Sequence, residues 1–254
     1  MKRAISSRPL LFLFLASAAV PAPGQVKTPL EFEVASVKPN TLNDRIVTID
    51  VGPGGRFAAR GYTLKLLLQR AFGMKGFQIA GGPPWLDIDR YDVVAKAPAD
   101  VTDDLTEEQL RPMLQALLTD RFGLRFHKVS KEMPGFALTA IGRSKLKPSA
   151  IKEEQSERTV RRRGAALVGE GVTTKTLATI FGSYLSRPIA DETGLKGLYD
   201  FEIAWTERAD QVTPEADGVS LITALREQLG LRLTPKSIVA ETIVIDRAEK
   251  ALPN

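Results

Sequence analysis

The 254-residue chain contains no cysteine and a single histidine, His127. The missing thiols exclude disulfides, thiolate zinc sites, iron–sulfur clusters and a cysteine nucleophile. One imidazole also cannot build a metal site of the two- or three-histidine kind within one chain. We therefore expect no metal and no cofactor, and any catalysis would have to use carboxylates, lysine, tyrosine or serine.

Aromatic residues are scarce at 7%, while 43% of residues are hydrophobic and 26% are charged, which is typical of a globular protein. The formal net charge is +5, but from residue 25 onward 32 basic residues face 30 acidic ones. The only dense basic run is residues 161–163, in a polar stretch. We interpret this run as a solvated loop and expect no nucleic-acid partner.

The first 24 residues have the pattern of a secretory signal peptide. Lys2, Arg3 and Arg8 precede an apolar run over residues 10–20, and small residues follow it. An uncleaved anchor is the alternative, but the run is about half of the ~20 residues that a span needs. We expect residues 1–24 to be removed, leaving a secreted or periplasmic protein without a membrane span.

Two helices can be read from capping residues and apolar spacing. Leucines and alanine at positions 64, 67, 68 and 71 predict a helix that begins after Thr63 and stops at Gly73. A longer helix over 106–122 has Thr106 and Gln109 as a capping box. Pro112 should kink this second helix or move its start to about residue 111.

Alternating apolar residues and turn signals predict the strands. The expected strands cover residues 46–51, 56–60, 91–97, 124–130 and 136–141. Pro134-Gly135 is interpreted as a break between the last two, and residues 142–165 as a long exposed loop.

The order of signals then recurs further along the chain. The matching pairs are Thr63-Leu64 with Thr176-Leu177, Tyr91-Asp92 with Tyr199-Asp200, and Gly123-Leu124-Arg125 with Gly230-Leu231-Arg232. We predict an α+β protein of two similar lobes, each a helix-strand-helix-strand-strand unit, related by internal duplication. The lobes would span residues 25–150 and 171–254, with a linker over 151–170. The alternative is two ordinary α+β halves that share generic leucine and glycine patterns.

Few residues are candidates for chemistry. His127 lies among charged neighbours with no nucleophile motif, so we interpret it as a surface histidine and name no catalytic residue. Asp87, Asp89 and Asp92 could serve acid–base hydrolysis or hold calcium. Their spacing lacks the glycine and terminal glutamate of a calcium loop, and turn capping is the simpler interpretation.

Two turn-rich loops at equivalent places in the repeat are the candidate ligand-binding loops. The first contains Pro84 and Trp85, and the second contains Arg187 and Asp191. An exposed tryptophan offers a large contact area for sugars or peptides. The alternative is that Trp85 covers a small core.

Five segments together carry a family resemblance: residues 32–40, 81–98 (GGPPWLDIDRYDVVAKAP), 110–127 (LRPMLQALLTDRFGLRFH), 187–201 and 225–233. The combination resembles an uncharacterised secreted family, a domain of unknown function, expanded in soil acidobacteria of the Solibacter type. It covers about residues 30–250. The resemblance implies an exported protein and implies no activity or catalytic residue.

The sequence thus favours an exported, non-enzymatic binding or interaction module whose partner is an unknown envelope protein or cell-wall ligand. The alternative is an extracytoplasmic hydrolase that works through carboxylates. A deep pocket with converging acids would indicate the hydrolase, and an exposed loop, groove or sheet edge would indicate the binding module.

The leader generates the first prediction. Residues 1–30, fused to a reporter that works only outside the cytoplasm, should give reporter activity because all three parts of a signal peptide are present. The same reporter without residues 1–24 is the control. A silent fusion that is well expressed would contradict export.

Overall fold

The computed structural model describes residues 31–42, 46–99, 101, 105–142, 144–151, 159–206 and 219–251. The expected leader, residues 1–24, lies outside the described residues. In the described part are four α-helices and twelve strands in three sheets, a mixed α/β architecture. None of the helices described there is long and apolar enough to cross a membrane.

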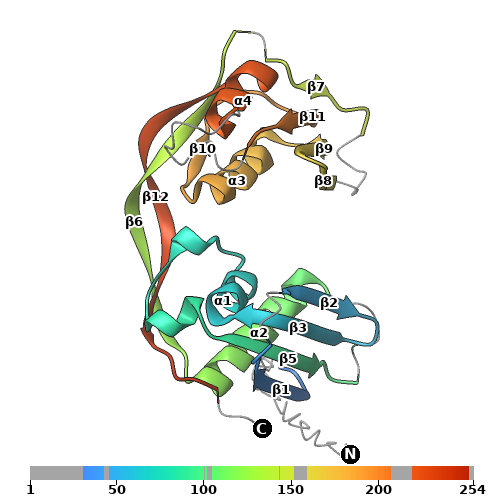
Figure 1. Ribbon diagram of the computed structural model, residues 1–254, viewed down its shortest axis with the longest axis vertical. Coiled ribbons are helices and arrows are strands. Elements are labelled where there is room, and N and C mark those ends of the chain that lie inside the picture. Colours follow the sequence, from blue (N-terminus) through green and yellow to red (C-terminus); the bar gives the residue numbers. More distant parts are fainter. Residues whose placement is uncertain are drawn as a thin grey trace, which may run out of the picture.

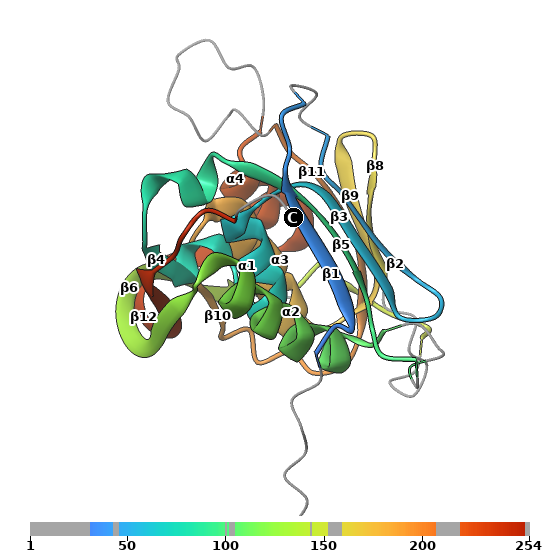
Figure 2. The ribbon, with the colours of Figure 1, turned by 90° about the horizontal axis from the view of Figure 1, so that it is seen from below.

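The first sheet is antiparallel and has the strand order β1-β5-β3-β2. Its strands are β1 (Val34–Pro39), β2 (Thr48–Gly52), β3 (Arg56–Thr63) and β5 (Arg90–Lys96). Helices α1 (Leu64–Phe72) and α2 (Glu107–Phe122) bury their apolar sides against one face of this sheet (Figure 2). We call this unit the first lobe. It also holds the short elements η1 (Gly76–Gln78), β4 (Ile79–Gly81) and η2 (Pro84–Asp87).

The second lobe is built around the sheet β7-β11-β9-β8, also antiparallel. Its strands are β7 (Lys147–Pro148), β8 (Thr159–Arg163), β9 (Ala166–Val172) and β11 (Tyr199–Ala204). Helices α3 (Thr174–Leu185) and α4 (Leu221–Leu229) cover it, and β10 (Ile189–Asp191) follows α3. The second lobe has its own cluster of buried apolar side chains, separate from that of the first.

A third sheet, the linking sheet, joins the lobes. Its centre is the antiparallel pair β6 (Arg125–Ala140) and β12 (Leu231–Arg247), which runs along one side of both lobes (Figure 1). Each short strand adds in parallel to one edge: β4 pairs with β12 at the first lobe, and β10 pairs with β6 at the second. The sheet order is therefore β10-β6-β12-β4.

The expected break at Pro134-Gly135 is wrong, because β6 continues through both residues. β10 joins β6 only from Phe136 onward, so Pro134 lies where β6 has one neighbour, β12. Proline is tolerated on such an edge because it needs to donate no second ladder hydrogen bond. The long register with β12 holds the strand together across the two residues.

The predicted helix ends are largely confirmed. Thr63 caps α1 and Gly73 ends it in the left-handed conformation, and Thr106 with Gln109 forms the capping box of α2. Pro112 lies inside α2, so the alternative start near residue 111 is wrong. The capping box fixes the first turn upstream of the proline, and the proline removes only one backbone donor.

One helix start differs from the expectation. α3 begins at Thr174 and is capped by Thr173, whose hydroxyl accepts from the backbone N–H of Thr176, so the helix opens before the Thr176-Leu177 pair. Within the expected linker, residues 152–158 lie outside the described residues, whereas β8 and most of β9 fall inside it.

The arginine run, expected in a solvated loop, forms strand β8. Alternation along the strand sends Arg161 and Arg163 to one face, where they pair with Glu170 (2.8 Å) and Glu202 (2.6 Å). Arg162 points to the other face and lies over two aromatic rings. The pairing of β8 with β9 therefore engages all three cations within the protein.

The two lobes repeat one backbone detail. In the first, the backbone N–H of Gly61 donates to Asp92 at 2.8 Å, and in the second Gly171 donates to Asp200 at 2.9 Å. Both glycines are left-handed, with φ of 67° and 65°, and each lies near a register shift between neighbouring strands. The aspartates that recur in sequence therefore hold the same kind of bulge.

This bulge generates a stability prediction. Gly61→Ala should destabilise the protein by at least about 2 kcal/mol more than Gly54→Ala in urea unfolding. Both glycines have a φ near +70°, but a Cβ at residue 61 would lie 2.2 Å from the carbonyl oxygen of Ile46, whereas residue 54 faces open space. Equal losses would show that the conformation, and not the close approach, sets the cost.

Candidate functional site: a pocket at the end of the first sheet

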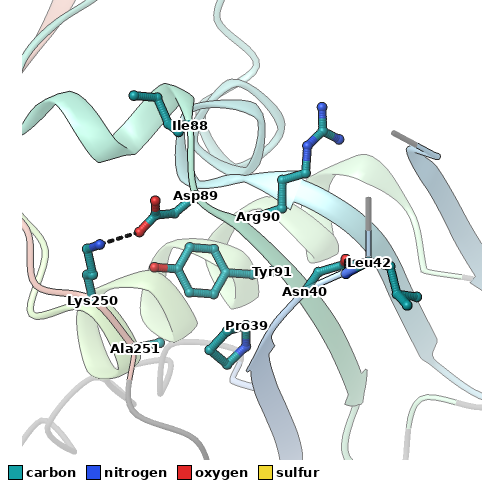
Figure 3. Close-up of a pocket in the computed structure, with 9 residues that line it drawn as sticks. All are labelled: Pro39, Asn40, Leu42, Ile88, Asp89, Arg90, Tyr91, Lys250 and Ala251. Carbon is teal, nitrogen blue, oxygen red and sulfur yellow. Dashed lines mark hydrogen bonds and ion pairs between the residues drawn. The ribbon is translucent and has the colours of Figure 1, made fainter. Parts of the chain in front are cut away.

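A pocket of about 690 Å³ opens where three distant segments meet (Figure 3). They are the end of β1, the turn between η2 and β5, and the chain that follows β12. The polar lining residues are Asn40, Asp89, Arg90, Tyr91 and Lys250, and the apolar ones are Pro39, Leu42, Ile88 and Ala251. The volume falls in the range of small-molecule and peptide sites.

Backbone hydrogen bonds bring the three segments together. The N–H of Asn40 donates to the carbonyl oxygen of Arg90 at 2.7 Å, which fixes the end of β1 beside β5. The N–H of Glu249 donates to the carbonyl oxygen of Phe122 at 2.7 Å, which anchors the chain after β12 on the end of α2. Lys250 is thereby placed opposite Asp89.

One ion pair lies within the pocket, and the other polar side chains hydrogen-bond residues beside it. The ammonium of Lys250 lies 2.6 Å from the carboxylate of Asp89, as Figure 3 shows. The guanidinium of Arg90 donates to the carbonyl oxygen of Gly61 at 2.9 Å. The amide of Asn40 donates to Asp92 at 2.7 Å. The floor is therefore polar: Asp89 and Lys250 form an ion pair, and Arg90 is held by a backbone carbonyl.

Tyr91 is the most deeply buried residue of the lining, with 2% of its surface exposed. Its ring meets the ring of Phe122 edge-on, with centroids 5.0 Å apart. Burial raises the pKa of the Tyr91 phenol, and the negative charge of Asp89 raises it further. The phenol therefore stays protonated at neutral pH, where it can share hydrogen bonds with a ligand but cannot act as a base.

The rim of the pocket exposes two large apolar side chains. Ile88 is 70% exposed and Leu42 is 55% exposed. For Ile88 the cause is the turn after η2, where the N–H groups of Ile88 and Asp89 both donate to the carbonyl oxygen of Trp85. That turn buries Leu86 below and lifts Ile88 outward. Exposed apolar side chains around a polar floor are typical of binding surfaces.

The three crowded aspartates point to three different partners. Asp87 pairs with Lys65 at 2.9 Å, Asp89 pairs with Lys250, and Asp92 accepts from Asn40 and from the bulge. Across the described residues, no group of three histidine or acidic side chains is placed to hold a metal ion. The geometry fits the structural interpretation of this segment.

The candidate loop at Trp85 lies beside the pocket. Trp85 is half-buried and packs on the first core, with its ring stacked 6.5 Å from that of Phe122. The ammonium of Lys250 lies 5.9 Å from the centre of the Trp85 ring. Pro84 is exposed at the start of η2. Trp85 thus supports the wall of the pocket from behind and does not line it.

The second candidate loop lies elsewhere. Arg187 is exposed, with its guanidinium 6.0 Å from the ring of Phe136. The carboxylate of Asp191 accepts from the hydroxyl of Thr174 at 2.6 Å and from the backbone of Thr193 at 3.1 Å. These bonds tie β10 to the start of α3.

The two candidate loops do not form one site. They flank opposite edges of the linking sheet, because β4 pairs with β12 and β10 pairs with β6. Their pairing positions are ten residues apart along the ladder, which is about 30 Å at the rise of a strand.

His127 lies on β6 with about half of its side chain exposed, at 54%. Its Nδ1 lies 2.9 and 3.0 Å from the two carboxylate oxygens of Asp246. No serine or threonine hydroxyl of the described residues hydrogen-bonds the imidazole, so the pair lacks a nucleophile. Asp246 was not foreseen, because only the β6–β12 register brings it beside His127.

Sequence reasoning also missed Leu42, Ile88 and Lys250. An apolar residue between two aspartates, as in Asp87-Ile88-Asp89, was the one available signal for Ile88. Lys250 follows the last strand and has no local pattern that links it to Asp89.

The chain belongs to the family described as "Protein of unknown function (DUF3738)", whose model matches residues 65–248. The resemblance to a domain of unknown function is thereby confirmed at the level of the family. No match is found among the curated proteins or among the solved structures.

The buried phenol generates a pH prediction. Because the folded pKa of Tyr91 is raised, its contribution to stability is fully present below about pH 10 and is lost as the pH rises further, since the unfolded chain releases the proton first. Tyr91→Phe should therefore lose less stability than the wild type between neutral and strongly alkaline pH. Tyr62, whose pKa burial also raises, leaves a residual slope.

The measurement is urea unfolding at a series of pH values. Tyr184→Phe is the control, because Tyr184 is 40% exposed and lies in the second lobe. Identical alkaline slopes for Tyr91→Phe and the wild type would contradict the burial of an ionisable phenol in the pocket floor.

Proposed function

We propose that the protein is a non-enzymatic binding module and that the pocket at the end of the first sheet is its binding site. One observation carries the proposal: two exposed apolar side chains, Ile88 and Leu42, border a polar floor whose one carboxylate among the described residues, Asp89, is already paired with Lys250. Burying the rim against a partner would stabilise a complex by roughly 1.5–3 kcal/mol for each large side chain that becomes covered. The partner we propose is an envelope protein or a cell-wall ligand.

The pocket is poorly suited to the alternative, a hydrolase acting through carboxylates. Such chemistry uses two carboxyl groups about 5–10 Å apart, one of them in its protonated form. Asp89 is the single carboxylate among the described residues that line the pocket, and it is held by Lys250. The protonated phenol of Tyr91 supplies a hydrogen-bond partner instead of a base.

The extracytoplasmic location is part of the proposal and rests on residues 1–24.

We also propose that the two lobes arose by internal duplication. The order β3-α1-β4-β5-α2-β6 recurs as β9-α3-β10-β11-α4-β12, and Gly123 and Gly230 end α2 and α4 in the same left-handed conformation. The paired Gly–Asp bulges support the same inference.

Nucleic acid is not among the proposed partners. The arginines of β8 pair with glutamates of the same lobe or lie over its aromatic rings.

The test compares two variants of matched exposure. Ile88→Asp places a charge on the rim of the pocket, and Val239→Asp places one on β12, where Val239 is 68% exposed. A component captured from an envelope extract by the wild-type protein is purified and its Kd is measured by calorimetry. Ile88→Asp should weaken binding at least tenfold, whereas Val239→Asp and His127→Ala should leave it unchanged.

Trp85→Ala should also weaken binding, but it should lower stability as well, by about 2–4 kcal/mol, because the ring is part of the first core. Ile88→Asp is therefore the sharper variant. Equal binding by wild type and Ile88→Asp would overturn the assignment of the pocket. Chemical conversion of the captured component, abolished in His127→Ala at an unchanged Tm, would favour the hydrolase.

A further inference from the structure

A second cavity, of about 490 Å³, lies between the two lobes. α1 and α3 face each other across this region in Figure 1. The first lobe contributes Lys65, Gln69, Lys75 and Phe77, and the second contributes Ser183 and Ser186. The cavity shares no lining residue with the pocket at the end of the first sheet.

The lining of this cleft is cationic and rich in hydrogen-bond donors. No carboxylate lines it among the described residues. Lys65 is paired with Asp87, but half-buried Lys75 forms no ion pair with a described residue. The amide of Gln69 and the hydroxyl of Ser186 likewise hydrogen-bond no described residue. An ammonium, an amide and a hydroxyl therefore remain available toward one cavity.

Ser186 adds an independent observation. Among the described residues it is the only one other than glycine with a positive φ, at 52°. The other three helices end on glycine in this conformation, namely Gly73, Gly123 and Gly230. Glycine would adopt it without the steric cost that a side chain incurs. Ser186, which lines the cleft, thus places a hydroxyl at a helix end, whereas the glycines at the other three helix ends have no side chain.

We propose that the cleft between the lobes binds the phosphoryl group of a small organic phosphate, held by Lys75, Gln69 and Ser186. Lysine contacts phosphate as a point charge, whereas a planar carboxylate is best held by the fork of an arginine. No arginine of the described residues lines the cleft. The volume exceeds that of a phosphate ion, and the Phe77 ring provides an apolar wall for the organic part of the ligand.

A ligand held in this way would contact both lobes. Lys75 and Gln69 belong to the first lobe and Ser186 to the second, and the β6–β12 pair is what joins the lobes beside the cleft. Bound phosphate would therefore bridge the lobes across a connection of two strands.

The test is calorimetric titration of the full chain with phenyl phosphate, inorganic phosphate and benzoate at low ionic strength. Phenyl phosphate should bind most tightly, inorganic phosphate more weakly, and benzoate at least tenfold more weakly than phenyl phosphate. The two phosphates separate recognition of a free ion from recognition of an ester, and benzoate reports on the carboxylate class.

Two variants and a matched control locate the site. Lys75→Gln should weaken phenyl phosphate binding at least tenfold, while Lys175→Gln, the same charge change at the exposed start of α3, should change it less than twofold. Ser186→Gly should weaken binding yet unfold at a higher urea concentration, because glycine relieves the left-handed strain. A merely structural serine would not separate these two readouts.

The outcomes are decisive in both directions. Three outcomes would each overturn the proposal. Phenyl phosphate does not bind, or Lys75→Gln and Lys175→Gln lose the same affinity for it, or benzoate binds as tightly as phenyl phosphate. Ile88→Asp should bind phenyl phosphate normally, so failure of the pocket at the end of the first sheet and failure of the cleft are distinguishable.

Discussion

The antiparallel pairing of β6 with β12 is the constraint on which the rest of the molecule depends. The register runs from Leu231 opposite Ala140 to Ile245 opposite Phe126, between segments about a hundred residues apart in sequence. Each long strand serves both cores. β12 contributes Leu231 to the second cluster and Ile243 and Ile245 to the first. Closing so long a loop costs conformational entropy, which the many ladder hydrogen bonds and the two cores offset.

The same pairing positions both proposed sites. β12 delivers the chain end to α2, where the bond from Glu249 to Phe122 sets Lys250 opposite Asp89. It also holds the lobes so that α1 and the end of α3 border one cleft. Each site is assembled from segments that are far apart in sequence. Lysine is used differently in the two: in the pocket Lys250 is paired with Asp89, whereas in the cleft Lys75 has no carboxylate partner among the described residues.

The acidic residues that first suggested chemistry are used in the structure itself: Asp87 and Asp89 pair with lysines, and Asp92 holds the backbone. Asp92 and Asp200 each accept the N–H of a left-handed glycine, and Asp191 ties β10 to α3. A carboxylate engaged in this way is poorly placed for catalysis, because its lone pairs and charge are already satisfied. The recurrence of this glycine contact in both lobes accounts for the recurrence of the aspartate in the two Tyr-Asp pairs.

Features that depend on neighbours along the chain could be predicted from the amino-acid order. The caps at Thr63 and Thr106, the stops at Gly73 and Gly123 and most short strands follow from local hydrogen bonding and backbone preference. Features that depend on partners distant in sequence became visible in the folded chain alone. Pairing with β12 carries β6 through Pro134, pairing with β9 turns an arginine-rich segment into a strand, and the end of β12 places Lys250 beside Asp89. Local patterns do not predict these contacts, because their free energy arises between residues that are far apart in sequence.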